Sequence, residues 1–393
     1  QAISVTADNM DQYPDYAAYV TEEGYVVTGN AYMGGLVGKL CTTVHEAEDP
    51  SYEGKEAAEE LASWQVADWE EVDPENHWYD WYYPHYSAQT YYSVVKNVTI
   101  DGVTAQGNVI AGGIAGYVAN SSGEDFQGSA GQTGDGYALI HDVKVTNSKI
   151  TTTTSYSYGE SPRAGGAFGA LRACIAQGII LENNQVQAVA SAGQNTFGAG
   201  GFVGDLANPA NGANGKSCYN EETGEYEDYL YSLIQDVDVK GGSVRATHYV
   251  SGVVGWARNS YMSFYHINID GVDVEARNSY VGGVGGSLNN ALLSDVTVSD
   301  SRFVAGTDHV GSVTGDAGAL ENIRVENCQV YTAGTQTVSY AGGVAGSVRS
   351  QVLDEENVTY DAATNPSIYV NNVDVQGGQY TGGVFGSMSN NSE

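Results

Sequence analysis

The stretch GGIAGYV at residues 112–118 decides the fold of this 393-residue chain, because it belongs to a pattern that recurs nine times. The pattern is G-G-h-x-G-x-h, in which h is an apolar residue. The copies are GGLVGKL (34–40), GGIAGYV (112–118), GGAFGAL (165–171), GGFVGDL (200–206), SGVVGWA (251–257), GGVGGSL (282–288), GSVTGDA (311–317), GGVAGSV (342–348) and GGVFGSM (382–388). Such recurrence is the signature of a repeat architecture, in which each unit packs on its neighbours.

The fifth position of the motif is glycine in every copy. Gly255, Gly286, Gly315 and Gly346 lie about 30 residues apart, and longer spacings elsewhere contain insertions. Because side chains alternate between the faces of a strand, we expect positions 1, 3, 5 and 7 to share a face. A glycine inside a strand costs roughly 0.5–1 kcal/mol relative to alanine. Its retention indicates a close approach, and we expect a large side chain from a facing sheet to press against it.

A second strand pattern lies between the copies. Examples are NVTIDGV at 97–103, DVKVTNSKI at 142–150 and NIRVENCQV at 322–330. Alternating β-branched residues, a polar pair and a further apolar residue predict a strand, a corner and another strand. The fold class predicted is therefore all-β: a β-solenoid (β-helix) of about nine coils, each pairing with the next at about 4.8 Å. Residues 1–31 start or cap this solenoid, and residues 32–393 form it.

Four insertions follow copies of the motif, at residues 41–95, 119–138, 207–230 and 349–367. Insertions at one register of a solenoid leave from one edge, which predicts a decorated side. The alternative is that insertions are merely tolerated at positions where the chain already forms a loop. Both interpretations stay open. The first insertion is expected to be partly helical, because segment 51–67 is rich in Ala, Glu and Leu and begins with a capping Ser51.

The first insertion is the candidate binding site. It is acidic and holds four of the chain's five tryptophans. Aromatic side chains are rigid, are enriched at binding hot spots and stack on sugar rings. The alternative is that these rings pack the insertion onto the solenoid as a small core or an end cap. The candidate partner-binding residues are Trp64, Trp69, Trp78, Tyr79, Trp81, Tyr82, Tyr83 and Tyr86.

The G-G-h-x-G motif resembles the GLUG-motif repeats, named for this pattern of glycine and apolar residues. The resemblance covers residues 32–388 without the insertions. It implies a secreted or surface protein of bacteria, because such repeats occur in adhesins and beside some immunoglobulin-A-cleaving metallopeptidases. Its implied partner is an extracellular host protein or glycan, with immunoglobulin or a mucin-type glycoprotein suggested by the family's company. The sequence itself names no partner.

Catalysis is not expected. The zinc motif H-E-x-x-H is missing, because His45-Glu46 is followed by Ala47 and then by two acidic residues, Glu48 and Asp49. A carbohydrate-active β-helix enzyme is one alternative, with outward carboxylates such as Asp236 and Asp238, or Asp270 and Asp273, as its acid and base. Regular alternation already explains these residues as a solvated face. A mechanical spacer within a larger surface protein is the other alternative.

The charge composition of the chain limits the classes of partner that it can bind. The formal net charge is -33, from 15 Lys+Arg against 48 Asp+Glu. Nucleic acid and anionic membranes bind clustered basic residues, so both are excluded as direct partners. No signal or anchor segment is recognisable, and we expect an extracellular or cell-surface fragment of a longer protein, with its oligomeric state open. The third insertion carries clustered acidic residues but no calcium-loop spacing, so neither a metal nor a cofactor is expected.

The four cysteines lack the C-x-x-C spacing of zinc sites. Cys328 lies in a strand-like run and is expected to be a small core residue. Cys174 and Cys218 each follow a copy of the motif, and a disulfide between them stays open. Cys41 has no assigned partner.

Overall fold

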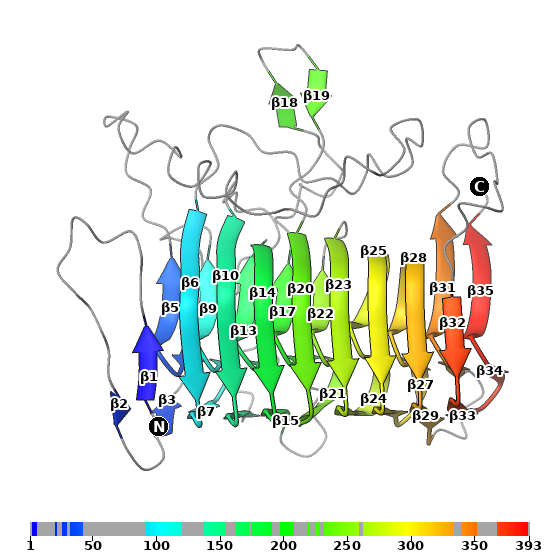
Figure 1. Ribbon diagram of the computed structural model, residues 1–393, viewed down its shortest axis with the longest axis horizontal. Coiled ribbons are helices and arrows are strands. Elements are labelled where there is room, and N and C mark those ends of the chain that lie inside the picture. Colours follow the sequence, from blue (N-terminus) through cyan, green and yellow to red (C-terminus); the bar gives the residue numbers. More distant parts are fainter. Residues whose placement is uncertain are drawn as a thin grey trace.

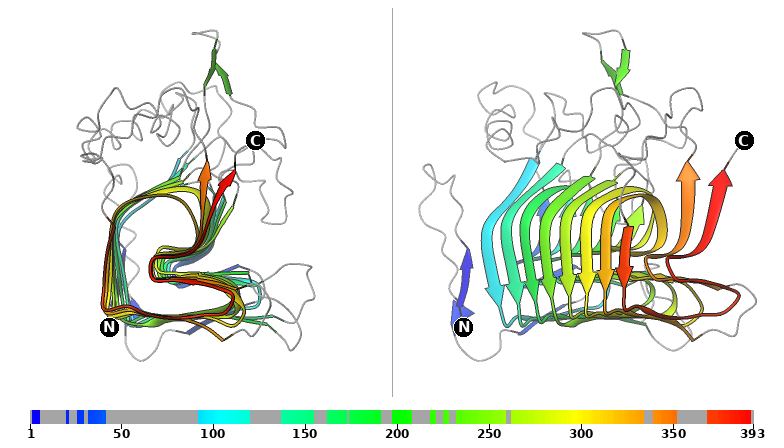
Figure 2. Two further views of the ribbon diagram at one scale, coloured as in Figure 1. Left: turned by 90° about the vertical axis from the view of Figure 1, so that its right-hand side faces the viewer. Right: turned by 45° about the vertical axis from the view of Figure 1, so that its right-hand side comes forward.

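The computed structural model describes residues 2–5, 20–21, 26–29, 32–41, 92–119, 137–154, 162–172, 174–190, 197–207, 218–220, 225–227, 232–258, 262–333, 339–351 and 368–391. In these residues parallel strands stack along one axis (Figure 1). The predicted all-β, solenoid-like fold is therefore confirmed. Viewed along the axis, the coils superpose on one outline that folds inward on one side (Figure 2). Among the residues described, none forms a helix long and apolar enough to cross a membrane.

Each coil contributes four strand segments, and equivalent segments pair in parallel to form four rows. The first row contains β6 (Tyr92–Asp101), β10 (Tyr137–Thr146), β14 (Cys174–Glu182), β20 (Ser232–Lys240), β23 (Met262–Asp270), the second halves of β25 (Gly285–Ser299) and β28 (Thr314–Glu326), and β32 (Ile368–Asn371). The second row contains β3 (Val26–Gly29), β7 (Thr104–Gly107), β11 (Lys149–Thr154), β15 (Gln185–Ala190), the first halves of β21 (Ser243–Ser251) and β24 (Asp273–Gly282), β26 (Arg302–Ala305), β29 (Gln329–Thr332) and β33 (Asp374–Gln376).

The other two rows lie on either side of the inward fold. The third row contains β4 (Tyr32–Gly34), β8 (Ile110–Gly112), β12 (Arg163–Gly165), β16 (Phe197–Gly200), the second halves of β21 and β24, β27 (Asp308–Gly311), β30 (Tyr340–Gly342) and β34 (Tyr380–Gly382). The fourth row contains β5 (Val37–Cys41), β9 (Ala115–Ala119), β13 (Phe168–Arg172), β17 (Val203–Ala207), β22 (Val254–Arg258), the first halves of β25 and β28, β31 (Ala345–Gln351) and β35 (Phe385–Asn391).

The first and second rows meet at a corner built from Asn, Asp and Gly. At each corner at least one residue has a left-handed backbone, which these residue types adopt at low cost. The corner residues are Gly102, Asn147, Asn183, Gly241, Gly271, Asp300, Asn327 and Asn372, with φ from 48° to 75°. The polar pair in the second sequence pattern therefore makes the strand–corner–strand unit that we expected.

The glycine motif is a bend between two strands, so the expectation of one straight strand is wrong. In the second coil β8 ends at Gly112, the bend contains Gly113 and Ile114, and β9 begins at Ala115. Two consecutive glycines allow this change of direction, and each bend is held by its neighbour, as when the Gly113 N–H donates to the Gly166 carbonyl at 3.0 Å. The alternation rule does not continue through such a bend.

The fifth glycine of the motif brings the third and fourth rows into contact. A Cβ at Gly204 would lie 2.6 Å from the carbonyl oxygens of Ala164 and Gly169, and one at Gly255 would lie 2.5 Å from the Ala199 nitrogen. The predicted close approach is therefore present. At these two positions, however, the opposing group is backbone and not the large side chain that we expected.

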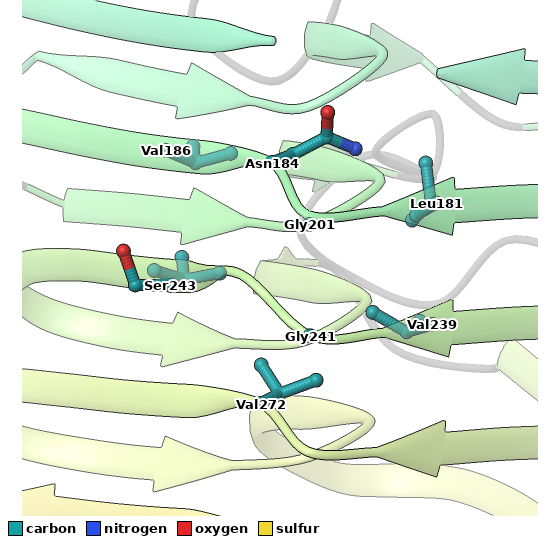
Figure 3. A pocket seen from close by; sticks show the side chains of 9 residues that line it. Leu181, Asn184, Val186, Gly201, Val239, Gly241, Ser243 and Val272 are labelled. Carbon is teal, nitrogen blue, oxygen red and sulfur yellow. The ribbon is translucent and has the colours of Figure 1, made fainter. Parts of the chain in front are cut away.

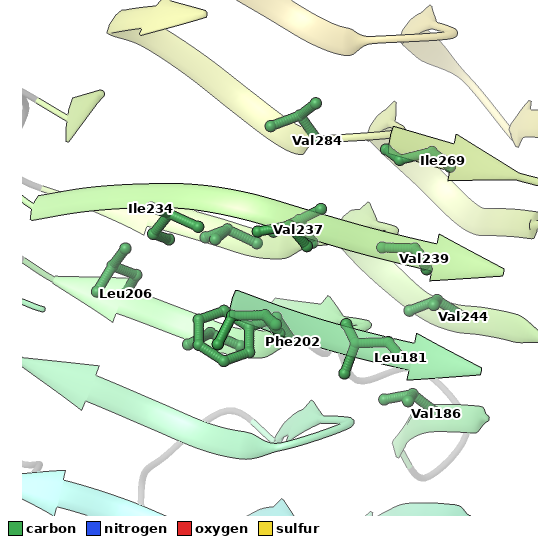
Figure 4. Close-up of a cluster of buried hydrophobic side chains, with 14 of the residues drawn as sticks. Leu181, Val186, Phe202, Leu206, Ile234, Val237, Val239, Val244, Ile269 and Val284 are labelled. Carbon is green, nitrogen blue, oxygen red and sulfur yellow. The ribbon is translucent and has the colours of Figure 1, made fainter. Parts of the chain in front are cut away.

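The core lies between the first two rows and the bends. Phe202 stands at a bend, is fully buried and meets the Phe168 ring edge-on, with 5.5 Å between centroids. Leu181, Ile234 and Leu206 pack around it (Figure 4). Burying each such side chain contributes about 1.5–3 kcal/mol. Cys328 is also buried, as predicted from its strand-like run.

Three antiparallel pairings depart from the parallel rows. β1 (Ala2–Val5) pairs antiparallel with β6 and with β2 (Val20–Thr21), at the N-terminal end of the first row. β18 (Cys218–Asn220) and β19 (Glu225–Glu227) form an antiparallel pair within the third insertion. The predicted helix of the first insertion lies outside the described residues.

Candidate functional site

The insertions leave the solenoid from one edge. β5 ends at Cys41 and β6 begins at Tyr92; β9 ends at Ala119 and β10 begins at Tyr137. The two exit points are paired residues of neighbouring coils, and so are the two return points. The third insertion leaves from Ala207 in the same register, and the fourth from β31. The strands thus include a few residues assigned to insertions from the sequence, such as 92–95.

The same connection is short in other coils. A single residue separates β13 from β14, three residues separate β22 from β23, and β25 and β28 pass through without interruption. The solenoid therefore closes this connection without any insertion. The eight predicted binding residues, Trp64, Trp69, Trp78, Tyr79, Trp81, Tyr82, Tyr83 and Tyr86, all lie in 42–91, outside the described residues. Their role stays a prediction.

A column of aromatic rings stands near this edge, and sequence reasoning missed it. Each ring occupies the position two residues before a glycine motif, on the third row. The successive centroid distances are 4.8, 4.7, 4.6 and 4.9 Å. We call Tyr249, Tyr280, His309, Tyr340 and Tyr380 the ring column. Within the column each inner ring has another ring on both faces, and Tyr380 is stacked on one side only among the described residues.

The backbone of the ring column is strained in three coils. Tyr249, Tyr280 and His309 have φ of 54°, 65° and 51°. A left-handed conformation costs roughly 1–2 kcal/mol at residues with a Cβ, so the stacking of the rings has to offset this cost. Such strain is concentrated at functional sites of proteins. It makes the ring column a candidate site in its own right.

The facing fourth row contributes the sixth residue of each motif. Trp256 stacks on Tyr249 with 5.1 Å between centroids. Asp316 is buried and accepts a hydrogen bond of 2.7 Å from the Ser347 hydroxyl. These side chains lie close to the insertion edge, because the strand ends two residues after Trp256, at Arg258. We call the sixth motif residues of the fourth row the fourth-row wall. At about 3.3 Å per residue, this wall lies about 7 Å from the strand end at the insertion edge.

Toward the N-terminal coils, the sixth motif residues of the fourth row face an arginine of β12 and a tyrosine of β4 in the third row. Arg163 and Asp205 form an ion pair in which both side chains are buried. The Arg163 guanidinium carbon also lies 5.7 Å from the Trp256 ring centroid. Farther along, the fully buried Tyr117 packs against Tyr32, with 5.6 Å between centroids. From the second coil to the fifth, the sixth motif residue therefore changes from aromatic (Tyr117) to apolar (Ala170), then to acidic (Asp205) and again to aromatic (Trp256).

Burial and carboxylates shift the pKa values beside the ring column. Burial lowers the pKa of His248, although the negative charge of Asp308 opposes this shift. Burial raises the pKa of Tyr249, and the charges of Asp308 and Asp316 add to it. Both shifts favour a neutral side chain. Tyr249 of the ring column therefore lies within the electrostatic influence of two carboxylates, those of Asp308 and Asp316.

The carboxylates considered for a hydrolase have structural partners on the outer face. Asp236 accepts from the Gln177 amide at 2.8 Å and lies 3.3 Å from His266 Nδ1. Asp238, Asp270 and Asp273 are likewise bonded to residues of neighbouring coils, respectively Asn268, Ser299, and the pair Arg245 and Arg302. These bonds tie one coil to the next. They give no pair of carboxylates a distinct acid and base role.

Tyr265 lies on the same outer face. Burial, the negative charge of Asp295 and a hydrogen bond to Asp295 together raise its pKa to about 12. His266 stands between two carboxylates, with Nε2 3.8 Å from Asp295. Within the described ranges, no three His, Cys, Asp or Glu side chains are arranged to hold a metal ion.

The cysteines and the interior offer no further site. Cys174 is a buried free thiol whose pKa burial raises to about 12, so it forms no disulfide with Cys218. A cavity of about 10 Å³ lies under the corners, lined by Leu181, Asn184 and Val272 (Figure 3). A space of this size approaches that of one water molecule and is too small for an organic ligand.

Comparison of the chain with known protein families, with curated proteins and with solved structures finds no match.

Proposed function

We propose that the chain is a non-catalytic binding module of a bacterial secreted or cell-surface protein, an adhesin whose solenoid displays insertion loops to an extracellular host protein or glycan. One observation carries the proposal: the insertions leave from the same strand edge in register. Elsewhere the coils are joined at this edge by continuous strands or by connections of one or three residues, so the stack needs no such loops for folding. Insertions that leave from one edge are attached where other solenoids present their binding side.

The ring column supports the same edge as the binding face. The ring column faces the fourth-row wall. Each residue of that wall stands about two residues before the point on its strand where an insertion can leave. Trp256 and Tyr249 already place stacked aromatic faces there, 5.1 Å apart. Aromatic residues dominate binding energy in many interfaces, and the four tryptophans of 42–91 belong to the insertion that connects β5 to β6 at this edge. We therefore assign partner contact to the insertions and a supporting role to the ring column.

The bacterial and host assignments rest on the resemblance to GLUG-motif repeats. Acidity supports an extracellular partner that is neither nucleic acid nor an anionic membrane. A spacer role is the competing function, since a regular stack of coils serves as a rod without contacting anything. The two functions differ in what an insertion does. A binding module loses affinity for its partner when the binding insertion is removed, whereas a spacer binds no partner and its function is unaffected by that removal.

The test replaces one insertion at a time. In the first variant, residues 42–91 are exchanged for the three-residue connection 259–261, which joins the same strand edge between β22 and β23. The matched control exchanges residues 120–136, an insertion of the adjacent coil that contains neither Trp nor Tyr. A third variant keeps the loop but changes Trp64, Trp69, Trp78 and Trp81 to alanine.

All four proteins are applied to an array of extracellular glycans and host glycoproteins, including immunoglobulin and mucin-type molecules. We expect the full chain and the 120–136 control to bind the same targets. The exchange of 42–91 and the four-tryptophan variant are expected to lose at least tenfold in affinity. Equal binding by all four proteins removes the first insertion from the function, and no binding by the full chain favours the spacer.

A further inference from the structure

The third row contains a β-bulge beside the ring column. Ala246 of β21 pairs with Ala276 of β24, whereas His248 pairs with Ser279, so two steps along β21 face three steps along β24. Bulges are uncommon between parallel strands and often lie beside functional sites, where they re-aim side chains. The residue that follows His248 is Tyr249, the first ring of the ring column. The bulge therefore lies where the column begins.

One side-chain hydrogen bond spans the bulge. Asn278 belongs to the bulged segment of β24, and its Nδ2 lies 3.2 Å from His248 Nε2. The amide is oriented with its nitrogen toward the ring, and an amide nitrogen only donates, so Nε2 presents its lone pair. This bond holds the imidazole in the neutral form that carries its proton on Nδ1. A second proton, on Nε2, places two donors against each other and breaks the bond.

The surroundings of His248 disfavour that second proton. Burial lowers the pKa of His248, and the negative charge of Asp308 on β27 opposes this shift. Asp308 already has an imidazole beside it, because its Oδ1 lies 3.3 Å from His309 Nδ1. On the other side, His248 pairs with Phe197 of β16, which does not titrate. The bulge itself carries Arg277, whose side chain is exposed.

The bond matters because Tyr249 depends on its surroundings. Tyr249 has a left-handed backbone with φ of 54°, and its ring stacks on Tyr280 and Trp256 with 4.8 and 5.1 Å between centroids. The His248 ring centroid lies 6.3 Å from that of Tyr249. Strained backbone persists only where the surrounding structure holds it. An imidazolium has to leave this partly buried position for water, and the support of Tyr249 goes with it.

We propose that His248 and Asn278 form a proton-operated latch. At neutral pH their hydrogen bond holds the bulge and the start of the ring column in place. In acid, protonation of His248 opens the latch and releases Tyr249 from its stack with Trp256 and Tyr280. The latch concerns the conformation of the third row and is independent of what the insertions bind.

The direction of the pH dependence follows from the lowered pKa. A histidine whose pKa is lower in the folded chain than in the unfolded chain stabilises the fold only while it is neutral. The contribution of His248 is therefore complete above about pH 6.5, the ordinary value for histidine. It is lost as the pH falls through the lower value of the folded chain.

The test measures amide protection in β21, β22 and β24 by hydrogen exchange, from about pH 7.5 to about pH 4.5. Protection factors are used, because they allow for the intrinsic pH dependence of exchange. We expect the parent chain to lose at least tenfold of its protection around Tyr249 in acid. His248→Phe, which repeats the residue of the preceding coil, is expected to keep it. The control His266→Gln changes a histidine of the outer face and is expected to respond like the parent.

A second variant reverses the sign. Asn278→Asp has nearly the same shape as the parent but places a carboxylate against Nε2, which accepts from an imidazolium. Its protection is expected to rise as the pH falls, down to about pH 4, where the carboxylate itself takes up a proton. This variant keeps the test decisive where His248→Phe does not fold. The proposal is overturned if the parent keeps its protection in acid, or if either variant loses protection as the parent does.

Discussion

Replacing Gly166 by alanine tests the packing rule on which the stacked coils depend. Gly166 is the second glycine of the third motif, and a Cβ there would lie 1.9 Å from the Gly201 carbonyl oxygen. Normal contact needs more than 3 Å, so the two coils have to move apart by over 1 Å at the bend. The opposing atom belongs to the backbone, which yields less readily than the end of a flexible side chain.

The expected cost follows from what that movement disturbs. Overpacking a well-packed core costs typically 1–3 kcal/mol. The Gly166 N–H donates to the Gly200 carbonyl at 3.0 Å, and the Phe168 N–H donates to the Phe202 carbonyl at 2.9 Å. Weakening these two bonds adds up to about 1 kcal/mol each. The variant is therefore expected to lose about 1–5 kcal/mol of stability.

Gly383→Ala is the matched control, because it makes the same change at the same motif position with no neighbour within 4 Å. Its stability is expected to stay within about 0.5 kcal/mol of the parent, the usual range for a surface substitution. The assay is amide hydrogen exchange in residues 162–172 and 197–207, supported by urea unfolding. A loss below about 1 kcal/mol at Gly166, or equal losses at both glycines, refutes the packing argument.

Three further predictions concern buried and titrating groups. Arg163→Met is expected to lower stability by about 3–5 kcal/mol, because it leaves the Asp205 carboxylate buried without its partner; the double variant with Asp205→Leu is expected to recover most of that loss in urea unfolding. In a variant whose other cysteines are alanine, the buried Cys174 thiol is expected to stay unreactive toward a thiol reagent until urea unfolds the chain, and rapid native labelling would contradict its burial. Tyr265, with its pKa raised to about 12, contributes stability that is complete below about pH 10 and is lost as pH rises through 12. Tyr265→Phe is expected to lose less stability over that window, with absorbance at 295 nm as the check.

The repeat made most of the fold predictable. Nine copies of a glycine motif fixed the solenoid, and the Asn, Asp and Gly pairs located its corners, because few other residues adopt a left-handed backbone. The bend at the motif was missed because alternation was applied across Gly112 and Gly113. Consecutive glycines are a recognised turn signal, so this feature was within reach of the sequence.

The candidate site was less predictable. The insertion edge follows from the position of the loops after the motif, and the strand ends lie in one register. The ring column had a partial signal, since Tyr280, Tyr340 and Tyr380 each stand two residues before a Gly-Gly pair. The left-handed backbone of Tyr249 and Tyr280 has no such signal, because bulky residues rarely adopt it. This backbone conformation is compensated by the stacking of rings between coils, and that stacking depends on the whole fold.

Footprinting of the chain with its ligand tests the central claim most directly. The ligand is the tightest target from the array, and hydrogen exchange is compared with and without it. The account predicts protection in residues 42–91, along the fourth-row strand ends near Ala119 and Arg258, and beside Tyr249. Protection confined to the outer faces of the first and second rows, around Asp236 or Asp273, would contradict the claim that the insertion edge is the binding face.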